Sequence, residues 1–420
     1  MSKKNESIET RLVHGEDFTA AWDFSNQLVA PMTSNTTYRL KSVERGAEGF
    51  ATYGELPKGE KIWIYDRLDE PNNLMLEEQL IYMERGEGAV TFASGMGAIS
   101  AVCMTTLESG DLIYSDSAIY GCTHSLFKNW LPRLNIKTEW KDFTDLKFLD
   151  EIPDNLKLLY FESVANPTLK VADIKKICEK VFLINQNRPE KDHLLVAVDN
   201  TFATPLGCNP IFLGADFSIH SLTKNISGFG TELGGAVVTK AKWETPLKLA
   251  RKDYGAVLNS KSSWSILNHG LPTMHLRFNR QQESAQEIAR FLKNQTDVEN
   301  IYYPGFSEDA ATINTLSSNS EEKFQPGFML SFTLVGDIER TKKFVNFIAK
   351  ESYSITLAVS LGLTKTLIEV PRLMTHSSYD DDSSKEGKIE DKLIRLSVGV
   401  ESKVDIIKDL MMAFDFIKNA

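Results

Sequence analysis

Between about residues 74 and 260 the chain alternates amphipathic stretches with short apolar runs. The segment LMLEEQLIYMERG (74–86) places apolar residues at helical spacing and stops at a glycine, which predicts a helix. Five short apolar runs end in polar residues, and they read AVTFAS, DLIYSD, LKLLYFES, HLLVAVDN and ADFSIHS. Such runs are typical of strands buried on both faces. Their alternation with helices predicts an α/β fold with a mostly parallel sheet covered by helices.

After about residue 261 the pattern changes. The stretch 263–295 predicts a long helix interrupted at Pro272. A strand (PGFMLSFTLV), a helix (ERTKKFVNFIAKES), two further apolar runs (ITLAVSLG, IRLSVGV) and a terminal helix (VDIIKDLMMAFDFIKN) follow. Because 420 residues exceed what one hydrophobic core usually holds, we predict three parts: an extended N-terminal arm (1–65), a larger domain (66–260) and a smaller C-terminal α/β domain (261–420).

Composition narrows the class of protein. Hydrophobic residues make up 42% of the chain and charged residues 25%, as in soluble globular proteins, and the net charge of −10 argues against a nucleic-acid or membrane partner. No apolar stretch approaches the roughly 20 residues of a membrane span, and the start MSKKNESIETR has no signal-peptide pattern. The four cysteines are far apart, which argues against a metal site and predicts a reducing, cytoplasmic location.

The ends of the predicted strands carry unusual polar residues. Ligands of open α/β sheets bind outside the carboxyl ends of the strands, and here those ends continue as TFASGMG, DSAIYGCTH, YFESVANP, VAVDNTF and SIHSLTKNISGFG. Taken singly, each has an ordinary interpretation. A Ser-Gly pair makes a turn, Asp199 caps a helix, and Lys224 lies in solvent. Taken together, they match the parts of one ligand.

That ligand has a phosphate, a ring nitrogen and a carbonyl group. Backbone N–H groups at a helix N-terminus favour an anion, and hydroxyl donors add to them; the residues are Ser94, Gly95, Met96, Ser221 and Thr223. Asp199 would keep a ring nitrogen protonated, Tyr120 would stack on the ring, and Lys224 would form a Schiff base. These are the groups that pyridoxal 5′-phosphate (PLP) requires, so the sequence predicts a PLP-dependent enzyme.

The motifs resemble one family. YDRLDEPNN, FASGMGAI, YGCTHSLF, FESVANPTLKVADI, VAVDNTFATPLGCNP, HSLTK, AVSLG, MTHSSY and IRLSVGVE follow one another as in the PLP-dependent enzymes of cysteine and methionine metabolism, the cystathionine γ-synthase/γ-lyase group. The resemblance covers nearly the whole chain. It implies fold-type-I architecture, with residues 66–260 as the PLP-binding domain, and a homotetramer built from two active dimers that acts on an amino acid.

The resemblance also implies roles for residues that have bland interpretations by themselves. Tyr65 and Arg67, otherwise an ordinary loop pair, match residues that reach the cofactor phosphate of the neighbouring subunit. Arg395, otherwise half of a surface ion pair, matches the residue that binds the substrate carboxylate, with Ser360 beside it. Asn166, otherwise a turn residue before proline, matches the side chain near the ring oxygen of the cofactor.

The reaction is less sharply defined. Cys122 replaces a frequent glycine and resembles the methionine γ-lyases, although it can also be a small buried hydrophobe. ARKDYGAVL resembles the same enzymes and places Lys252 and Asp253 near the substrate, although they can also be a solvated charge pair. Lys365 stands where enzymes that act on cystathionine often carry Glu.

The resemblance therefore implies γ-elimination on a sulfur amino acid, first of all methionine. The catalytic candidates are Lys224, which would move protons at Cα and Cβ, Tyr120, which would protonate the leaving sulfur, and Cys122. Cystathionine γ-lyase, cystathionine γ-synthase and O-acylhomoserine sulfhydrylase remain alternatives within the family. A non-catalytic paralogue is the alternative from a different class.

Overall fold

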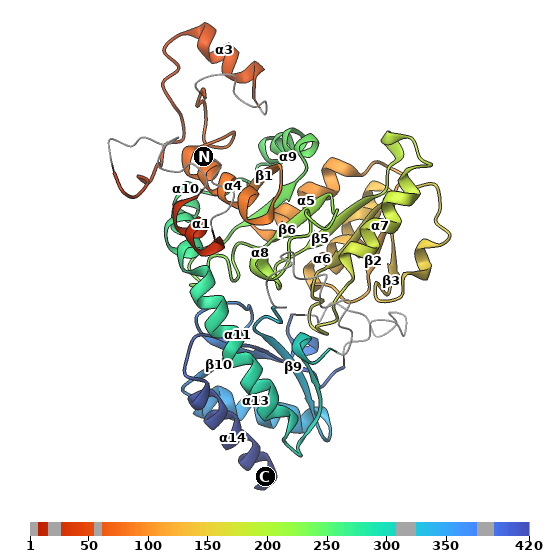
Figure 1. The fold of residues 1–420 in the computed structure, drawn as a ribbon, viewed down its shortest axis with the longest axis vertical. Coiled ribbons are helices and arrows are strands. Elements are labelled where there is room, and N and C mark those ends of the chain that lie inside the picture. Colours follow the sequence, from red (N-terminus) through yellow and green to blue (C-terminus); the bar gives the residue numbers. More distant parts are fainter. Residues whose placement is uncertain (1–6, 16–26, 54–60, 308–324, 376–389, 420) are drawn as a thin grey trace. The chain divides into compact units, whose positions relative to one another are not determined.

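The computed structural model describes residues 7–15, 27–53, 61–307, 325–375 and 390–419 (Figure 1). The chain divides into two compact units, residues 1–107 with 210–275 and residues 108–209 with 276–420. The structure has one larger, mostly parallel sheet and one smaller sheet of five strands near the C-terminus. The predicted boundaries of the arm and the two domains stay predictions.

The first unit contains three strands of the larger sheet. They are β1 (Gly88–Phe92), β6 (Phe217–His220) and β7 (Gly235–Thr239), and β7 pairs antiparallel with both β1 and β6. Every residue in these strands is buried, as their apolar sequences require. Helix α4 (Pro71–Glu84) packs against β1, and α5 (Gly95–Thr106) packs against β6, β7 and α9 (Ala241–Tyr254). The sequence predicted β1, β6, α4 and α5 but missed β7.

The ends of α4 and α5 follow from local chemistry. Glu70 accepts the N–H groups of Asn72 and Asn73 at the start of α4, and Pro71 occupies the first helical position. Ser94 caps α5 by accepting the N–H of Gly97 at 3.1 Å. Because β1 ends only two residues before Ser94, the first turn of α5 begins at the carboxyl end of that strand.

The second unit contains the parallel strands of the larger sheet. They follow the order β5-β4-β2-β3, with β2 (Leu112–Asp116), β3 (Lys137–Lys141), β4 (Leu156–Glu162) and β5 (Leu195–Asp199). Helices α6 (Gly121–Ser125), α7 (Ile174–Asn185) and α8 (Thr204–Gly207) follow β2, β4 and β5 along the chain. The β4–β5 register sets Glu162 opposite Asp199, so two acidic residues end neighbouring strands.

The same unit carries the smaller sheet. Its order is β10-β11-β12-β9-β8, with β8 (Val298–Tyr302), β9 (Met329–Leu334), β10 (Ile355–Leu357), β11 (Thr366–Glu369) and β12 (Ile394–Ser397). Helices α13 (Ile338–Glu351) and α14 (Lys403–Asn419), labelled in Figure 1, pack against each other. Phe332, Phe344 and Phe414 join them to the sheet in one buried core. The β11–β12 register sets Glu369 opposite Arg395.

The long helical stretch is interrupted earlier than predicted. A π-helical turn, Ile266–Gly270, separates α10 (Ser260–Ser265) from α11 (Leu271–Lys293). Pro272 follows this turn as the second residue of α11, and because proline lacks an N–H and its ring crowds the preceding turn, it accounts for the irregular turn before α11. Gly270 is needed in the turn, because a Cβ there would lie 2.6 Å from the carbonyl oxygen of Ile226.

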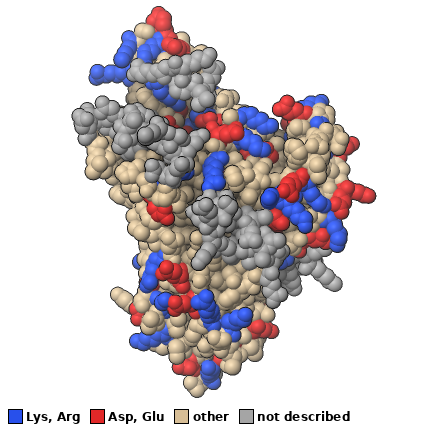
Figure 2. All heavy atoms as spheres, viewed as in Figure 1, with Lys and Arg blue, Asp and Glu red and all other residues tan. Residues whose placement is uncertain are grey.

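Two short helices lie in the described parts of the predicted arm, α1 (Ile8–His14) and α3 (Val43–Ala51). The acidic stretch YDDDSSKEGKIED (379–391), whose charge predicts a solvated loop, lies largely outside the described residues. On the face shown in Figure 2, positive and negative side chains are interspersed. No helix in the described part of the chain combines the length and the apolar composition needed to cross a membrane.

Candidate active site

The first unit brings together the residues predicted to bind phosphate and the predicted Schiff-base lysine. We call Ser94, Gly95, Met96, Ser221, Thr223 and Lys224 the lysine cluster. Lys224 lies in a tight turn after β6, in which its N–H donates to the Ser221 carbonyl and its own carbonyl accepts the N–H of Gly228. A Cβ at Gly95 would lie 2.9 Å from the Cβ of Ser221. Only glycine therefore allows the N-terminus of α5 to approach the lysine turn this closely.

Two side chains of the lysine cluster have backbone partners. The Thr223 hydroxyl donates to the Gly234 carbonyl at 3.2 Å and accepts the N–H of Gly234 at 3.1 Å, and the Ser94 hydroxyl caps Gly97. The positive end of the α5 dipole and the N–H groups of its first turn are then the main attraction for an anion. The arrangement fits the phosphate of PLP beside an amine at Lys224.

The second unit contains six more of the predicted residues, which we call the arginine cluster: Asp199, Tyr120, Cys122, Asn166, Ser360 and Arg395. Arg395 is 3% exposed; it donates to the Asn166 side-chain oxygen at 2.9 Å and to the Ser360 carbonyl at 3.0 Å. Its second partner, Ser360, has φ +92°, a strained conformation that costs about 1–3 kcal/mol and often occurs at functional sites. The bond to Arg395 helps to hold it there.

Sequence reasoning missed Glu369, the counter-ion of Arg395. Its carboxylate lies 2.9 Å from the Arg395 guanidinium, and only 1% of the Glu369 side chain is exposed. Burial lowers the pKa of Arg395, and the Glu369 charge opposes that shift. The sequence motif contains the arginine but not its partner, because Glu369 lies on a different strand.

Sequence reasoning also missed Glu162, the last residue of β4. Its two carboxyl oxygens accept the N–H groups of Tyr120 and Asn166, each at 2.7 Å. Burial, followed by the nearby charge of Asp199, raises the pKa of Glu162 well above its usual value. A buried carboxylate at a strand end, visible in YFESVANP, was the available signal. Glu162 joins three predicted site residues.

Asp199 is fixed by two donors. One oxygen accepts the N–H of Thr201 at 3.0 Å, and the other accepts the hydroxyl of Tyr160 at 3.4 Å. Tyr160 was not predicted, since it lies within an apolar run. A carboxylate held at the end of β5 in this way suits the protonated nitrogen of a pyridine ring.

Tyr120 and Cys122 lie together, with the thiol sulfur 3.4 Å from the phenol oxygen. Burial raises the pKa of Tyr120, and the contact with Cys122 raises it further, whereas Arg395 opposes the shift. Tyr120 therefore keeps its proton at neutral pH, as a proton donor must. Cys122 is exposed in this chain, so it does not fit the alternative of a small buried hydrophobe.

The remaining predicted residues lie in the first unit, in or next to the loop 65–69, which we call the Tyr65 loop. Arg67 donates to the backbone carbonyl of Lys252 at 2.5 Å, and its guanidinium lies 5.5 Å from the centre of the Tyr65 ring. Lys252 also pairs with Asp253 at 3.5 Å. Tyr65 and Arg67 are exposed.

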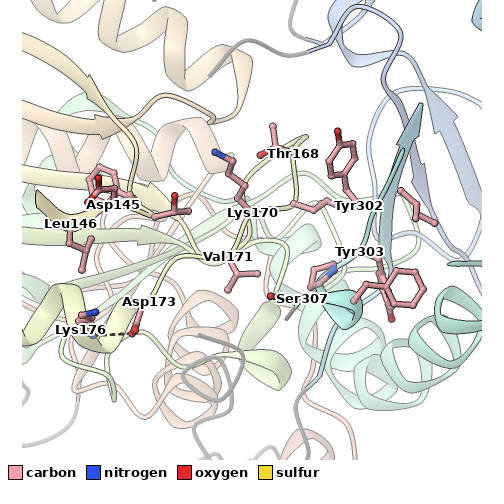
Figure 3. A pocket seen from close by; sticks show the side chains of 16 residues that line it. Asp145, Leu146, Thr168, Lys170, Val171, Asp173, Lys176, Tyr302, Tyr303 and Ser307 are labelled. Atoms are coloured by element: carbon pink, nitrogen blue, oxygen red, sulfur yellow. Dashed lines mark hydrogen bonds between the residues drawn. The ribbon is translucent and has the colours of Figure 1, made fainter. Parts of the chain in front are cut away.

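A cavity of about 580 Å³ in the second unit lies apart from these residues (Figure 3). Its walls come from segments 143–146, 168–176 and 301–307, and Figure 3 shows Lys170, Tyr302 and Ser307 among them. None of the predicted site residues lines it.

A mostly parallel large sheet, a smaller C-terminal sheet, a lysine in a turn after β6 and an acid at the end of β5 define a fold-type-I PLP-dependent enzyme. Residues 9–415 match the family described as "Cys/Met metabolism PLP-dependent enzyme". The chain belongs to this family, and it is an enzyme of the trans-sulfuration group that uses PLP.

Individual relatives agree with this assignment. The chain is 35% identical to an L-methionine γ-lyase of Fusobacterium nucleatum subsp. polymorphum, over 99% of this chain and 100% of that protein. The structure of cystathionine γ-lyase from Lactobacillus plantarum with L-serine is similar, with a TM-score of 0.84 and 30% identity over 98% of this chain and 100% of that one. A Campylobacter jejuni putative O-acetylhomoserine (thiol)-lyase with pyridoxyl-lysine phosphate has a TM-score of 0.85 and 28% identity over 98% and 100% of the two chains.

Proposed function

We propose that the enzyme is a methionine γ-lyase, which converts methionine into methanethiol, 2-oxobutanoate and ammonia. The observation that carries the proposal is the Cys122 thiol, 3.4 Å from the hydroxyl of the proposed proton donor Tyr120. A side chain there would meet the sulfur end of a substrate. The likeness to an L-methionine γ-lyase over the full length of both chains supports it.

Each predicted cofactor residue would bind one part of PLP. Lys224 would bind its aldehyde, Asp199 its ring nitrogen, Asn166 its ring oxygen and Tyr120 its ring face. The first turn of α5, with Ser94, Gly95, Met96, Ser221 and Thr223, would bind its phosphate. When bound, PLP supplies the electron sink for a carbanion. Asp199 favours that chemistry because its charge keeps the ring nitrogen protonated.

The protein side chains would orient the substrate and move its protons. Arg395 would bind the carboxylate through its planar guanidinium, with Ser360 beside it. The Lys224 amine would take the proton from Cα and, after releasing it, take a second proton from Cβ, and Tyr120 would give its proton to the leaving sulfur. Lys252 and Asp253 would line the substrate side. Fixing the carboxylate at Arg395 sets the orientation of the Cα–H bond, and such orientation lowers a barrier by several kcal/mol.

The assembly belongs to the same proposal. We infer a homotetramer of two active dimers, in which Tyr65 and Arg67 reach the cofactor phosphate of the neighbouring subunit. Their exposure and their mutual contact support this placement. Residues 66–260 would form the PLP-binding domain, between an N-terminal arm (1–65) and a C-terminal domain (261–420). We also infer a cytoplasmic location, since all four cysteines carry free thiols.

Cystathionine γ-lyase is the second candidate. The similarity to the Lactobacillus plantarum enzyme supports it. Lys365 argues against it, because this exposed residue stands where enzymes that act on cystathionine often carry an acid. Cystathionine γ-synthase and O-acylhomoserine sulfhydrylase would use the same cofactor residues but complete a replacement with a second substrate.

A product assay separates these activities. The purified enzyme is incubated with methionine, cystathionine or O-acetylhomoserine, each with and without added thiol. With methionine and no added thiol, methanethiol and 2-oxobutanoate are the expected products. Lys224→Ala should abolish both products, and full activity of this variant would refute the assignment of the lysine. Turnover of cystathionine but not methionine would favour the second candidate. No turnover of any substrate by PLP-loaded protein would favour a non-catalytic paralogue.

A further inference from the structure

Arg251, in the last turn of α9, is a fully buried cation in the first unit. Its exposed fraction is 0%. One nitrogen of the guanidinium donates to a carboxylate oxygen of Glu77 at 2.6 Å and to the carbonyl of Thr91 at 3.3 Å. The other donates to the carbonyl of Leu68 at 2.9 Å and lies 3.4 Å from a carboxylate oxygen of Asp69. Arg251 thus joins α4 and β1 to the Tyr65 loop.

A buried ion pair is a poor way to gain stability alone. Removing a guanidinium and its carboxylates from water is costly, and packed apolar side chains of similar volume often do as well or better. What the guanidinium offers is a planar set of donors in fixed directions. Here those directions lead to the last two residues of the Tyr65 loop, Leu68 and Asp69. The geometry therefore points to a positioning task.

Consecutive residues of α9 hold the loop from both sides. Arg251 binds its buried end, and the carbonyl of Lys252 accepts a hydrogen bond from Arg67 at its exposed end. The Tyr53 hydroxyl also donates to the Leu68 carbonyl at 3.0 Å, and Lys61 pairs with Asp69. Tyr65, which precedes the anchored residues of the loop, is 41% exposed. The loop is thus fixed at its base while it presents two side chains to its surroundings.

We propose that Arg251 is a positioning residue for cofactor binding in the neighbouring subunit. By fixing Leu68 and Asp69, it holds Tyr65 and Arg67 where they bind the phosphate of the partner's PLP. This inference rests on the proposed function, which assigns those two residues to the neighbouring subunit. Arg251 itself touches neither cofactor nor substrate; it acts through the loop.

The first test compares two cofactors. Arg251→Lys keeps a positive charge beside Glu77 and Asp69, so it should fold, but one ammonium cannot also reproduce the forked contacts to Leu68. We expect its affinity for PLP to fall roughly tenfold, the effect of one lost charge-assisted hydrogen bond. Its affinity for pyridoxal, which lacks the phosphate, should not change. Both are measured by absorbance titration of the apoenzyme, with circular dichroism as the check on folding.

Lys248→Gln is the matched control. Lys248 is a buried cation one turn earlier in α9, and its ammonium pairs with Glu244 at 2.7 Å. Its removal takes away a positive charge that acts on Asp69 but breaks no side-chain hydrogen bond to the Tyr65 loop, so the ratio of the two cofactor affinities should stay at the wild-type value. Equal losses of PLP and pyridoxal affinity in Arg251→Lys would show a general structural defect and overturn the proposal.

The second test asks in which subunit the defect appears. Chains with Arg251→Lys and chains with Lys224→Ala are co-expressed with different tags, and mixed assemblies are purified. In a mixed dimer, one site combines an intact Lys224 with a Tyr65 loop held by an intact Arg251. This site should bind PLP with wild-type affinity. Neither parent assembly has such a site, because one lacks Arg251 in every chain and the other lacks Lys224 in every chain. At limiting PLP, turnover per mixed dimer should reach about half that of the wild type, because one of its two symmetric sites is complete.

A parallel mixture separates this inference from the proposed function. Arg67→Ala chains paired with Lys224→Ala chains test only whether the Tyr65 loop acts on the neighbouring subunit. Recovery in that mixture but not with Arg251→Lys would overturn the role of Arg251 and leave the proposed function standing. Recovery in neither mixture would show that the Tyr65 loop serves its own subunit. That result would contradict both the role of Arg251 and the proposed action of Tyr65 and Arg67 on the neighbouring subunit.

Discussion

The buried pair between Glu369 and Arg395 allows the sharpest prediction about the arginine cluster. Both side chains are almost fully buried, and their charged atoms lie 2.9 Å apart. The substitution Glu369→Gln removes the negative charge but keeps an oxygen of similar size and position. The guanidinium of Arg395 then stays buried without its counter-ion, although its hydrogen bonds to Asn166 and Ser360 remain.

The expected cost follows from the burial. Breaking a buried ion pair on one side costs about 3–5 kcal/mol of stability. The amide oxygen of Gln can still accept one hydrogen bond, which offsets about 1 kcal/mol. We therefore expect Glu369→Gln to lower the free energy of unfolding by about 2–4 kcal/mol. If Arg395 binds the substrate carboxylate, an amino-acid ligand replaces the missing charge, so it should stabilise the variant more than it stabilises the wild type.

Urea titration followed by circular dichroism measures both effects, with and without a saturating unreactive amino acid. The control is Glu339→Gln, which breaks the exposed pair between Glu339 and Lys342 and should cost at most about 0.5 kcal/mol. A loss below 1 kcal/mol for Glu369→Gln would show that the pair does not compensate a buried charge. An equal stabilisation of variant and wild type by the ligand would refute the role of Arg395 in carboxylate binding.

Three further predictions concern single groups. Tyr120→Phe should lower kcat for methionine by about 10²–10⁴-fold, since it removes the proposed proton donor; unchanged product formation would contradict that role. Because burial raises the pKa of Glu70 to about 7, its contribution to stability is fully present below pH 4.5 and is lost as the pH rises towards 7. Glu70→Gln should therefore flatten the decline in unfolding free energy between pH 5 and 7, by up to about 1.4 kcal/mol per pH unit, and parallel pH profiles in urea titrations would argue against this. Ser94→Ala should cost about 1 kcal/mol through loss of the α5 cap, measured by urea unfolding of the apoenzyme; no loss would mean that the cap contributes nothing.

The lysine cluster shows how far local sequence can lead. The glycines of FASGMG, which follow one apolar run, predicted a turn from a strand into a helix. Lys224, which lies among hydroxyl residues after another apolar run, predicted a turn from a strand into a loop. The structure contains both, and Gly95 lies against Ser221. Their meeting was predictable because strand ends in such sheets gather at one edge. Strand β7 was missed, since GAVVT is short and follows a glycine-rich turn, and so the antiparallel pairing beside β6 was missed with it.

The arginine cluster marks the limit. The motifs contain Arg395, Asn166 and Tyr120, but Glu369 and Glu162 were not recognised as their partners. Asn166 is only four residues from Glu162, but Tyr120 is 42 residues away from it, and Glu369 and Arg395 are 26 residues apart on separate strands. The pairing of Glu369 with Arg395 depends on the register of β11 with β12, and that of Glu162 with Asp199 on the register of β4 with β5. Register is set by the packing of whole strands, so it leaves no signature in a short motif.

By itself, the sequence determined the class of fold, the order of most strands and helices, the cofactor and the family, because these follow from periodicity and from motifs of a few residues. Only the tertiary structure decided which charges are buried and which groups compensate them, with Arg251 beside Glu77 and Arg395 beside Glu369. The physical reason is that the cost of burying a charge depends on its neighbours in space, and folding brings those neighbours from distant parts of the chain.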